Sequence, residues 1–187
     1  MRRHRPPDHT ARILAEWAQE LPKLDTAPIA VAGRILRAAR YLEREIEREL
    51  AQHGLGIHEF NALSALRRIG PPHQMTPTEL SHALLFTSGG LSKLLERLER
   101  SGLVRRERGT HDRRVTVVCL TDAGRDVQER AILAHLKNEQ ELLAPLSQYE
   151  RDVTAQALQS LLVALELADA RRRPALRRVA APLAGEQ

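Results

Sequence analysis

The sequence of 187 residues is poor in cysteine, in aromatic residues and in long apolar runs, and each shortage excludes something. The single cysteine, Cys119, permits no disulfide within the chain and gives no reason to expect an oxidising compartment. Aromatic residues make up 3%, so we expect a core of aliphatic side chains on helices. Residues 1–10 lack the apolar segment of a signal sequence, and no apolar run is long enough to span a bilayer, so the sequence predicts a cytoplasmic protein without a membrane partner.

Positive charge is present in two places. Residues 88–114 contain eight Lys or Arg and four Asp or Glu, and residues 171–178 contain five Arg and no acid, within a net charge of +5. Everything outside these two stretches is therefore net negative. Clustered cations of this kind favour an anionic partner such as nucleic acid. The 42% of hydrophobic and 28% of charged residues are typical of a chain that folds around its own core.

Apolar residues spaced by three or four predict a mainly helical chain. The expected helices cover residues 9–20, 27–52, 58–69, 76–84, 87–101, 121–143 and 147–170. Thr76-Pro77-Thr78-Glu79 and Ser147-x-x-Glu150 are capping boxes that begin two of them. In the long second helix, one stripe of apolar residues must be buried: Ile35, Leu36, Ala39, Leu42, Ile46 and Leu50. The inward side of the third helix is expected to contain Phe60, Leu63, Leu66 and Ile69.

The apolar period changes to two after residue 103, which predicts a β-hairpin. Val115, Val117 and Cys119 share one side of the expected return strand, and a basic turn lies at residues 108–112. The two helices before the hairpin are joined by only a few residues, as in a helix-turn-helix. The fold class is therefore mainly α with a small β-hairpin wing (α+β): a winged helix-turn-helix with a helical dimerisation region. We assign residues 55–124 to DNA binding, 1–54 and 125–170 to dimerisation, and 171–187 to a flexible basic tail.

The helix that begins near residue 88 has the pattern of a recognition helix. Its leucines fix the buried side, so small donors at its start and cations further along lie on the opposite side, where base edges and phosphates would meet them. Two arginines at the hairpin tip are suited to a minor groove, with Asp112 orienting one of them. The predicted DNA-contacting residues are Thr76, Thr78, Thr87, Ser88, Gly89, Gly90, Ser92, Lys93, Arg97, Arg100, Arg113 and Arg114.

Residues 57–127 resemble the winged-helix core of the MarR family of bacterial regulators. The resemblance is carried by Thr76-Pro77-Thr78-Glu79-Leu80, Thr87-Ser88-Gly89-Gly90-Leu91-Ser92, Leu95-x-x-Leu98-Glu99-x-x-Gly102-Leu103-Val104, and Asp112-Arg113-Arg114 through Leu120-Thr121-x-x-Gly124. Residues 24–28 and 144–147 are similar to the urate-responsive, PecS-like branch. The resemblance implies a homodimer clasped by the first and last helices, and a repressor of transcription that binds double-stranded DNA at a palindromic operator until a small-molecule effector releases it.

The same branch implies a ligand site. Trp17 and Arg106 match two of the branch's ligand residues, whereas Asn61 and Leu94 stand where the branch has an acid and a second arginine. His58, close to Asn61, completes the candidate ligand residues. With two polar groups lost, we expect a more apolar or neutral effector than urate, or none.

Two other classes of protein remain open at this point. Eight histidines, among them His53, His58 and His135, allow a metal-responsive DNA-binding regulator, although no standard metal-ligand spacing is present and no cofactor is expected. A helical protein-interaction module without specific DNA binding is the other alternative. Motifs of nucleotide-binding and hydrolytic enzymes are absent, so no enzyme is expected. Cys119 is interpreted as a small buried apolar residue rather than a redox sensor.

Overall fold

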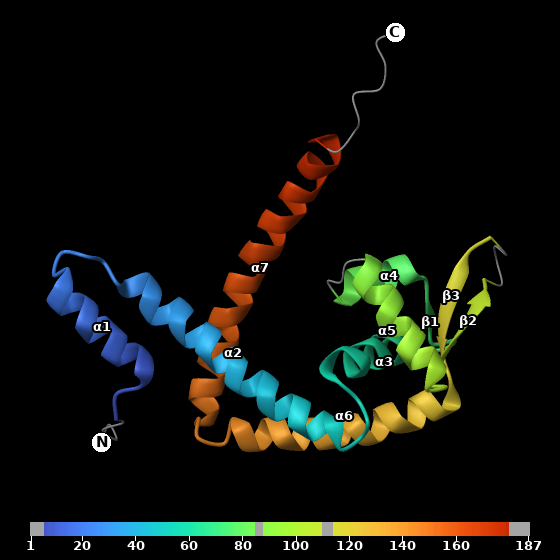
Figure 1. The fold of residues 1–187 in the computed structure, drawn as a ribbon. Helices are drawn as coiled ribbons and strands as arrows, with labels where there is room; N and C mark the ends of the chain where they lie inside the picture. The colour runs from blue at the N-terminus through green and yellow to red at the C-terminus, as the bar shows by residue number, and fades with distance from the viewer. Residues whose placement is uncertain (1–5, 85–87, 110–113, 180–187) are drawn as a thin grey trace, which may run out of the picture. The chain divides into compact units, whose positions relative to one another are not determined.

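The computed structural model describes residues 6–84, 88–109 and 114–179 (Figure 1). The elements in chain order are α1 (His9–Glu20), α2 (Ala27–Ala51), α3 (Ile57–Arg68), β1 (Gln74–Met75), α4 (Pro77–Leu84), α5 (Ser88–Arg100), β2 (Val104–Arg108), β3 (Thr116–Leu120), α6 (Asp122–Leu142) and α7 (Gln148–Val179). The prediction of a mainly helical chain with a hairpin before a long helix is confirmed. Three of the predicted site residues lie outside the described ranges: Thr87, Asp112 and Arg113.

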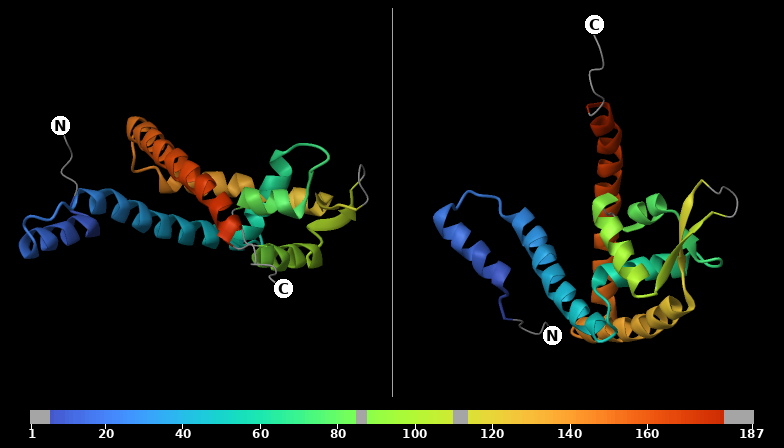
Figure 2. Two further views of the ribbon diagram at one scale, coloured as in Figure 1. Left: turned by 90° about the horizontal axis from the view of Figure 1, so that it is seen from above. Right: turned by 45° about the vertical axis from the view of Figure 1, so that its right-hand side comes forward.

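The chain divides into two compact units, residues 1–139 and 140–187. In the first unit α1 packs against α2, and the views of Figures 1 and 2 agree in placing the two helices side by side. Asp8 caps α1 by accepting a hydrogen bond of 2.7 Å from the backbone N–H of Ala11. The helix ends before Pro22, which cannot continue it.

The core of the first unit lies where α3, α4 and α5 meet the sheet. Leu63, Leu66, Leu80 and Leu98 are buried there. The three strands are antiparallel in the order β1-β3-β2, with Val104 opposite Leu120 in the β2–β3 pair. This arrangement is a winged helix-turn-helix, as the sequence predicts.

Three details of the core differ from the expectation. Ile69 is 48% exposed because α3 ends at Arg68, before that residue can turn inward. Val115 is exposed and precedes β3 instead of belonging to it, and β3 is buried on both faces, with Val117 and Cys119 on one and Val118 and Leu120 on the other. Strand β1 was not predicted, because two residues are too few to show an alternation.

The apolar stripe of α2 is only partly buried within this chain. Of its six predicted members only Leu50 is fully buried, and Leu36 is 66% exposed. The expectation that the whole stripe is covered is therefore not met by the described residues alone.

The second unit contains the end of α6 and all of α7. Ser147 and Glu150 form the predicted capping box: Ser147 N and Oγ each lie 2.8 Å from Glu150 Oε2, and the Glu150 N–H donates to Ser147 Oγ. Helix α7 runs to Val179, past the predicted end at residue 170, so part of the expected tail is helical. Large apolar residues exposed on α7 are Tyr149, Val153, Leu158, Leu161, Leu162, Val163, Leu165 and Leu167.

Candidate nucleic-acid interface

Helix α4 begins with the predicted capping box. The backbone N–H and the hydroxyl of Thr76 both donate to Glu79 Oε2 at 2.8 Å, and the Glu79 N–H donates to Thr76 Oγ1 at 3.2 Å. The backbone and hydroxyl donors of Thr76 hold the pKa of Glu79 below its usual value. This cap fixes the start of α4 and leaves Thr78 exposed on its first turn.

The predicted recognition helix, α5, packs against the core through leucines. Leu91, Leu94, Leu95 and Leu98 are each at most 3% exposed, so their side of the helix is buried. The opposite side is open to solvent at Gly89, Ser92, Lys93, Glu96, Arg97 and Arg100, and Gly90 is half-buried. The assignment of buried and exposed sides is therefore confirmed, while DNA contact by individual residues stays a prediction.

One predicted phosphate contact, Arg97, already has a partner within the protein. Its Nη2 lies 2.5 Å from Oε1 of Glu59, a half-buried carboxylate in the first turn of α3. Gly56, the N-cap residue of α3, makes room for that carboxylate, because a Cβ at Gly56 would lie 2.6 Å from Glu59 Oε2. Sequence analysis did not single out Glu59, although its place three residues after an N-cap is a position where acids interact with a helix start.

A second carboxylate ties the wing to the recognition helix. Glu99 of α5 accepts the backbone N–H of Arg106 at 3.1 Å and lies 3.6 Å from the Arg106 guanidinium. On the neighbouring wing residues, Arg105 Nε lies 2.5 Å from Glu107. The contacts of Glu99 with Arg106 join β2 to α5, whereas the Arg105–Glu107 pair lies within β2.

The return side of the wing carries Arg114. It lies just before β3 and is exposed. With Lys93, Arg97 and Arg100 on α5, it gives this part of the first unit an excess of positive charge over carboxylates.

Cys119 is a buried residue of β3, the strand between β1 and β2. Its thiol lies 3.6 Å from Glu107 Oε2 and 3.7 Å from Gln74 Oε1. Burial, and then the Glu107 carboxylate, raise the pKa of the Cys119 thiol, which disfavours the reactive thiolate. Its interpretation as a buried small residue is supported.

The predicted ligand residues lie on three elements. Trp17 is on α1 and is 40% exposed, His58 and Asn61 are exposed on α3, and Arg106 is on β2. Among the described residues, Arg106 lines a pocket of about 450 Å³, the α4–α5 pocket, with Pro77, Thr78, Ser81, His82, Leu91, Ser92, Leu95 and Thr116. That lining includes none of the other three predicted ligand residues, so their role stays a prediction.

Two of the three histidines considered as metal ligands, His53 and His135, each lie near one carboxylate. His53 Nε2 lies 3.8 Å from Glu49, and His135 Nε2 lies 3.3 Å from Glu139 while its ring packs on Phe60. Within the ranges that the structure describes, no group of three His, Cys, Asp or Glu side chains is placed to hold a metal ion. The described helices also include none that is long and apolar enough to cross a bilayer.

The helix-turn-helix with its basic, carboxylate-tethered wing defines a winged-helix DNA-binding protein. A sequence profile of the MarR family matches residues 53–115. The transcriptional regulator PecS of Dickeya dadantii is 33% identical over 139 residues, which are 74% of this chain and 84% of PecS. The chain therefore belongs to the MarR family of DNA-binding transcriptional regulators.

Solved structures agree with this assignment. A MarR family regulator from Streptomyces coelicolor, in complex with DNA, has a TM-score of 0.67 and 26% identity over 76% of this chain and 94% of that chain. A MarR variant from Escherichia coli, complexed with operator DNA, shares the fold with a TM-score of 0.64 and 24% identity, over 78% of this chain and 97% of that chain. The predictions of the family, the fold and a DNA-binding regulator are confirmed.

Proposed function

We propose that the protein represses transcription by binding a palindromic operator as a homodimer, with α5 in the major groove and the wing in an adjacent minor groove. The observation that carries this proposal is the surface formed by α5 and the wing. Buried leucines pack one side of α5 against the core, and Glu99 of α5 accepts a hydrogen bond from the wing. On the opposite side of α5, small residues followed by cations are exposed to solvent. In a two-fold dimer, the half-sites are about one helical turn, roughly 34 Å, apart. Such a repressor acts in the bacterial cytoplasm.

The homodimer is supported by apolar side chains that each unit leaves exposed outside the DNA-binding core. In the first unit these include Leu21, Val31 and Leu36, and in the second unit the apolar residues of α7 named above. Concentrations of exposed apolar side chains of this kind mark protein interfaces. A second copy of the chain is the partner that two-fold operator recognition requires.

The effector part of the proposal concerns the α4–α5 pocket. A ligand there would touch the recognition helix through Leu91 and Leu95 and the wing through Arg106 at the same time. Binding would therefore change the position of α5 relative to the wing, the two elements proposed to contact DNA. A panel of phenols and purines, screened by shifts in melting temperature, tests this part of the proposal. Operator binding is then measured with each ligand that raises the melting temperature. Arg106→Gln should remove the effect of such a ligand.

Footprinting with the purified protein on the DNA upstream of its own and adjacent genes tests the proposal. We expect one protected region with a two-fold symmetric sequence, and a dimer in sedimentation velocity. Binding that never exceeds the non-specific range, with a Kd of about 10⁻⁴ to 10⁻⁶ M, would instead support the interaction module without specific DNA binding. A monomer bound to a single half-site would contradict the symmetric arrangement.

A further inference from the structure

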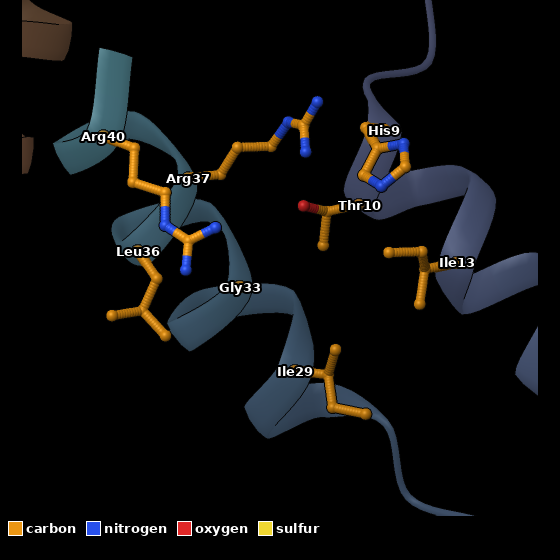
Figure 3. Close-up of a pocket in the computed structure, with 8 residues that line it drawn as sticks. All are labelled: His9, Thr10, Ile13, Ile29, Gly33, Leu36, Arg37 and Arg40. Atoms are coloured by element: carbon orange, nitrogen blue, oxygen red, sulfur yellow. The ribbon is translucent and has the colours of Figure 1, made fainter. Parts of the chain in front are cut away.

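Beyond its first residue, strand β2 has no buried side chain that could hold it against α5. Elsewhere in the first unit close packing does this work: α1 lies on α2 with Thr10 only 4% exposed, and a Cβ at Gly33 would lie 3.4 Å from Thr10 Cγ2 (Figure 3). In β2, Val104 is buried, whereas residues 105–108 are exposed. Polar contacts therefore have to fix this part of the wing against the recognition helix.

Glu99 of α5 supplies such a contact at an edge of the sheet. Strand β2 is an edge strand, because the strand order is β1-β3-β2, and the outward N–H groups of an edge strand have no partner within the sheet. The N–H of Arg106 donates instead to Glu99 Oε1 at 3.1 Å, and Arg106 Nε lies 3.6 Å from Glu99 Oε2. One carboxylate of the recognition helix thus holds both the backbone and the side chain of a wing residue.

The contact with Arg106 lies between the base and the tip of the wing. At the base, the N–H of Thr121 donates to the carbonyl oxygen of Leu103 at 3.2 Å. From there toward the tip, β2 and β3 are paired over the full length of both strands, and Arg114 lies just before β3. Because the strands are paired throughout, a movement of β2 about its base would carry Arg114 with it. The bond to Arg106 therefore helps to set where Arg114 lies relative to α5.

We propose that Glu99 is a positioning residue for DNA binding: its hydrogen bond with the Arg106 N–H holds the wing where Arg114 and α5 reach the same duplex. This role rests on the proposed placement of α5 and the wing on DNA. The side chain of Glu99 is 41% exposed, so its charge alone repels phosphates, and loss of the charge should strengthen DNA binding. A positioning role predicts weaker binding once the hydrogen bond is lost. The two effects therefore have opposite signs.

Glu99→Gln and Glu99→Ala separate the charge from the hydrogen bond. Both remove the same negative charge, but the amide oxygen in Glu99→Gln can still accept the Arg106 N–H, whereas Glu99→Ala has no acceptor. We expect Glu99→Ala to bind the footprinted operator about tenfold more weakly than Glu99→Gln, measured by fluorescence anisotropy at one salt concentration. Hydrogen exchange of the Arg106 amide should be faster in Glu99→Ala. Alanine favours a helix, so α5 should keep its structure in this variant.

Arg114→Ala, made in each of these backgrounds, tests whether Glu99 acts through the wing. Its loss of operator affinity should be about tenfold in the wild type and in Glu99→Gln, but about threefold or less in Glu99→Ala, where the wing no longer holds Arg114 in place. Glu96→Ala is the matched control, because Glu96 is exposed on the same helix and the variant loses the same charge. In that background the loss from Arg114→Ala should stay at about tenfold.

Two outcomes overturn the role of Glu99 alone. One is equal operator binding by Glu99→Gln and Glu99→Ala, and the other is a loss from Arg114→Ala that is the same in Glu99→Ala as in the wild type. An Arg114→Ala variant that binds like the wild type would contradict the placement of the wing on DNA, and the role of Glu99 with it.

Discussion

Arg97 of the recognition helix and Glu59 of α3 form an ion pair with an Nη2–Oε1 distance of 2.5 Å. Glu59 is only 18% exposed at its side chain, whereas Arg97 is 57% exposed and lies on the outward side of α5. A phosphate that approaches α5 therefore competes with a carboxylate of the protein for the same guanidinium. This competition makes the pair a direct test of the proposed DNA-binding surface.

We predict that Glu59→Gln strengthens DNA binding at low salt. Without the carboxylate, Arg97 is available to a phosphate, so the slope of log K against log salt should become steeper by about 0.9. Fluorescence anisotropy of a labelled operator at several salt concentrations measures both quantities. Glu129→Gln, which removes an exposed carboxylate 3.8 Å from Arg67, is the charge-matched control. Weaker binding with an unchanged slope would mean that Arg97 acts within the protein rather than on DNA.

Arg114→Ala should weaken operator binding by about 1–3 kcal/mol without changing the melting temperature. Arg114 is exposed at the start of the return side of the wing, where a guanidinium can enter a narrow minor groove. Gel-shift titration at a defined salt concentration gives the affinity. Arg130→Ala, an exposed arginine on α6, removes the same charge away from the wing. Equal affinities of the Arg114 variant and the wild type would refute a role for the wing.

Gly124→Ala should destabilise the fold by roughly 1–3 kcal/mol. A Cβ at this position would lie 2.0 Å from the carbonyl oxygen of Leu103 and 2.9 Å from Leu120 Cδ1, so the start of α6 would have to move away from the wing. Denaturant unfolding measures the loss. Gly89→Ala makes the same substitution where a Cβ meets no described atom within 4 Å, and it should leave stability unchanged or raise it by up to about 1 kcal/mol.

Glu79→Gln should remove part of the acid sensitivity of the fold. The pKa of Glu79 is lowered in the folded state, so its contribution to the free energy of unfolding is present above the unfolded pKa and is lost as pH falls through the folded pKa. Because the carboxylate is exposed, the free energy of unfolding of the wild type should exceed that of the variant by only about 0.5 kcal/mol at neutral pH. Urea unfolding at neutral pH and at a pH well below 4.5 measures the difference, which should shrink below pH 4.5 and vanish once the pH is below the folded pKa of Glu79. If the stability difference persists in acid, its cause is helix propensity and not the charge of Glu79. Glu47→Gln, the same substitution at an exposed position of α2, is the control.

The helices and their starts were predictable from the sequence to within about one residue, because the causes are local, whereas the end of α7 was not. The cap of Thr76 on Glu79 involves residues three apart, and the four leucines of α5 repeat at helical spacing, so both patterns are visible in the chain. The ion pairs of Glu59 with Arg97 and of Glu99 with Arg106 were not predictable, since they join different elements. The exposure of Leu36 escaped prediction for a related reason: periodicity indicates an apolar side but not whether the same chain covers it.

Gly89 has a consequence for how binding preference can change in this protein. A Cβ at position 89 would meet none of the described atoms within 4 Å, so the described part of the fold leaves room for a side chain to begin there. Such a side chain would extend from the outward side of α5, toward the surface proposed to dock against DNA. If α5 enters the major groove as proposed, exchanging this single residue would change which operator sequences are bound, while the leucines on the opposite side of the helix stay packed in the core.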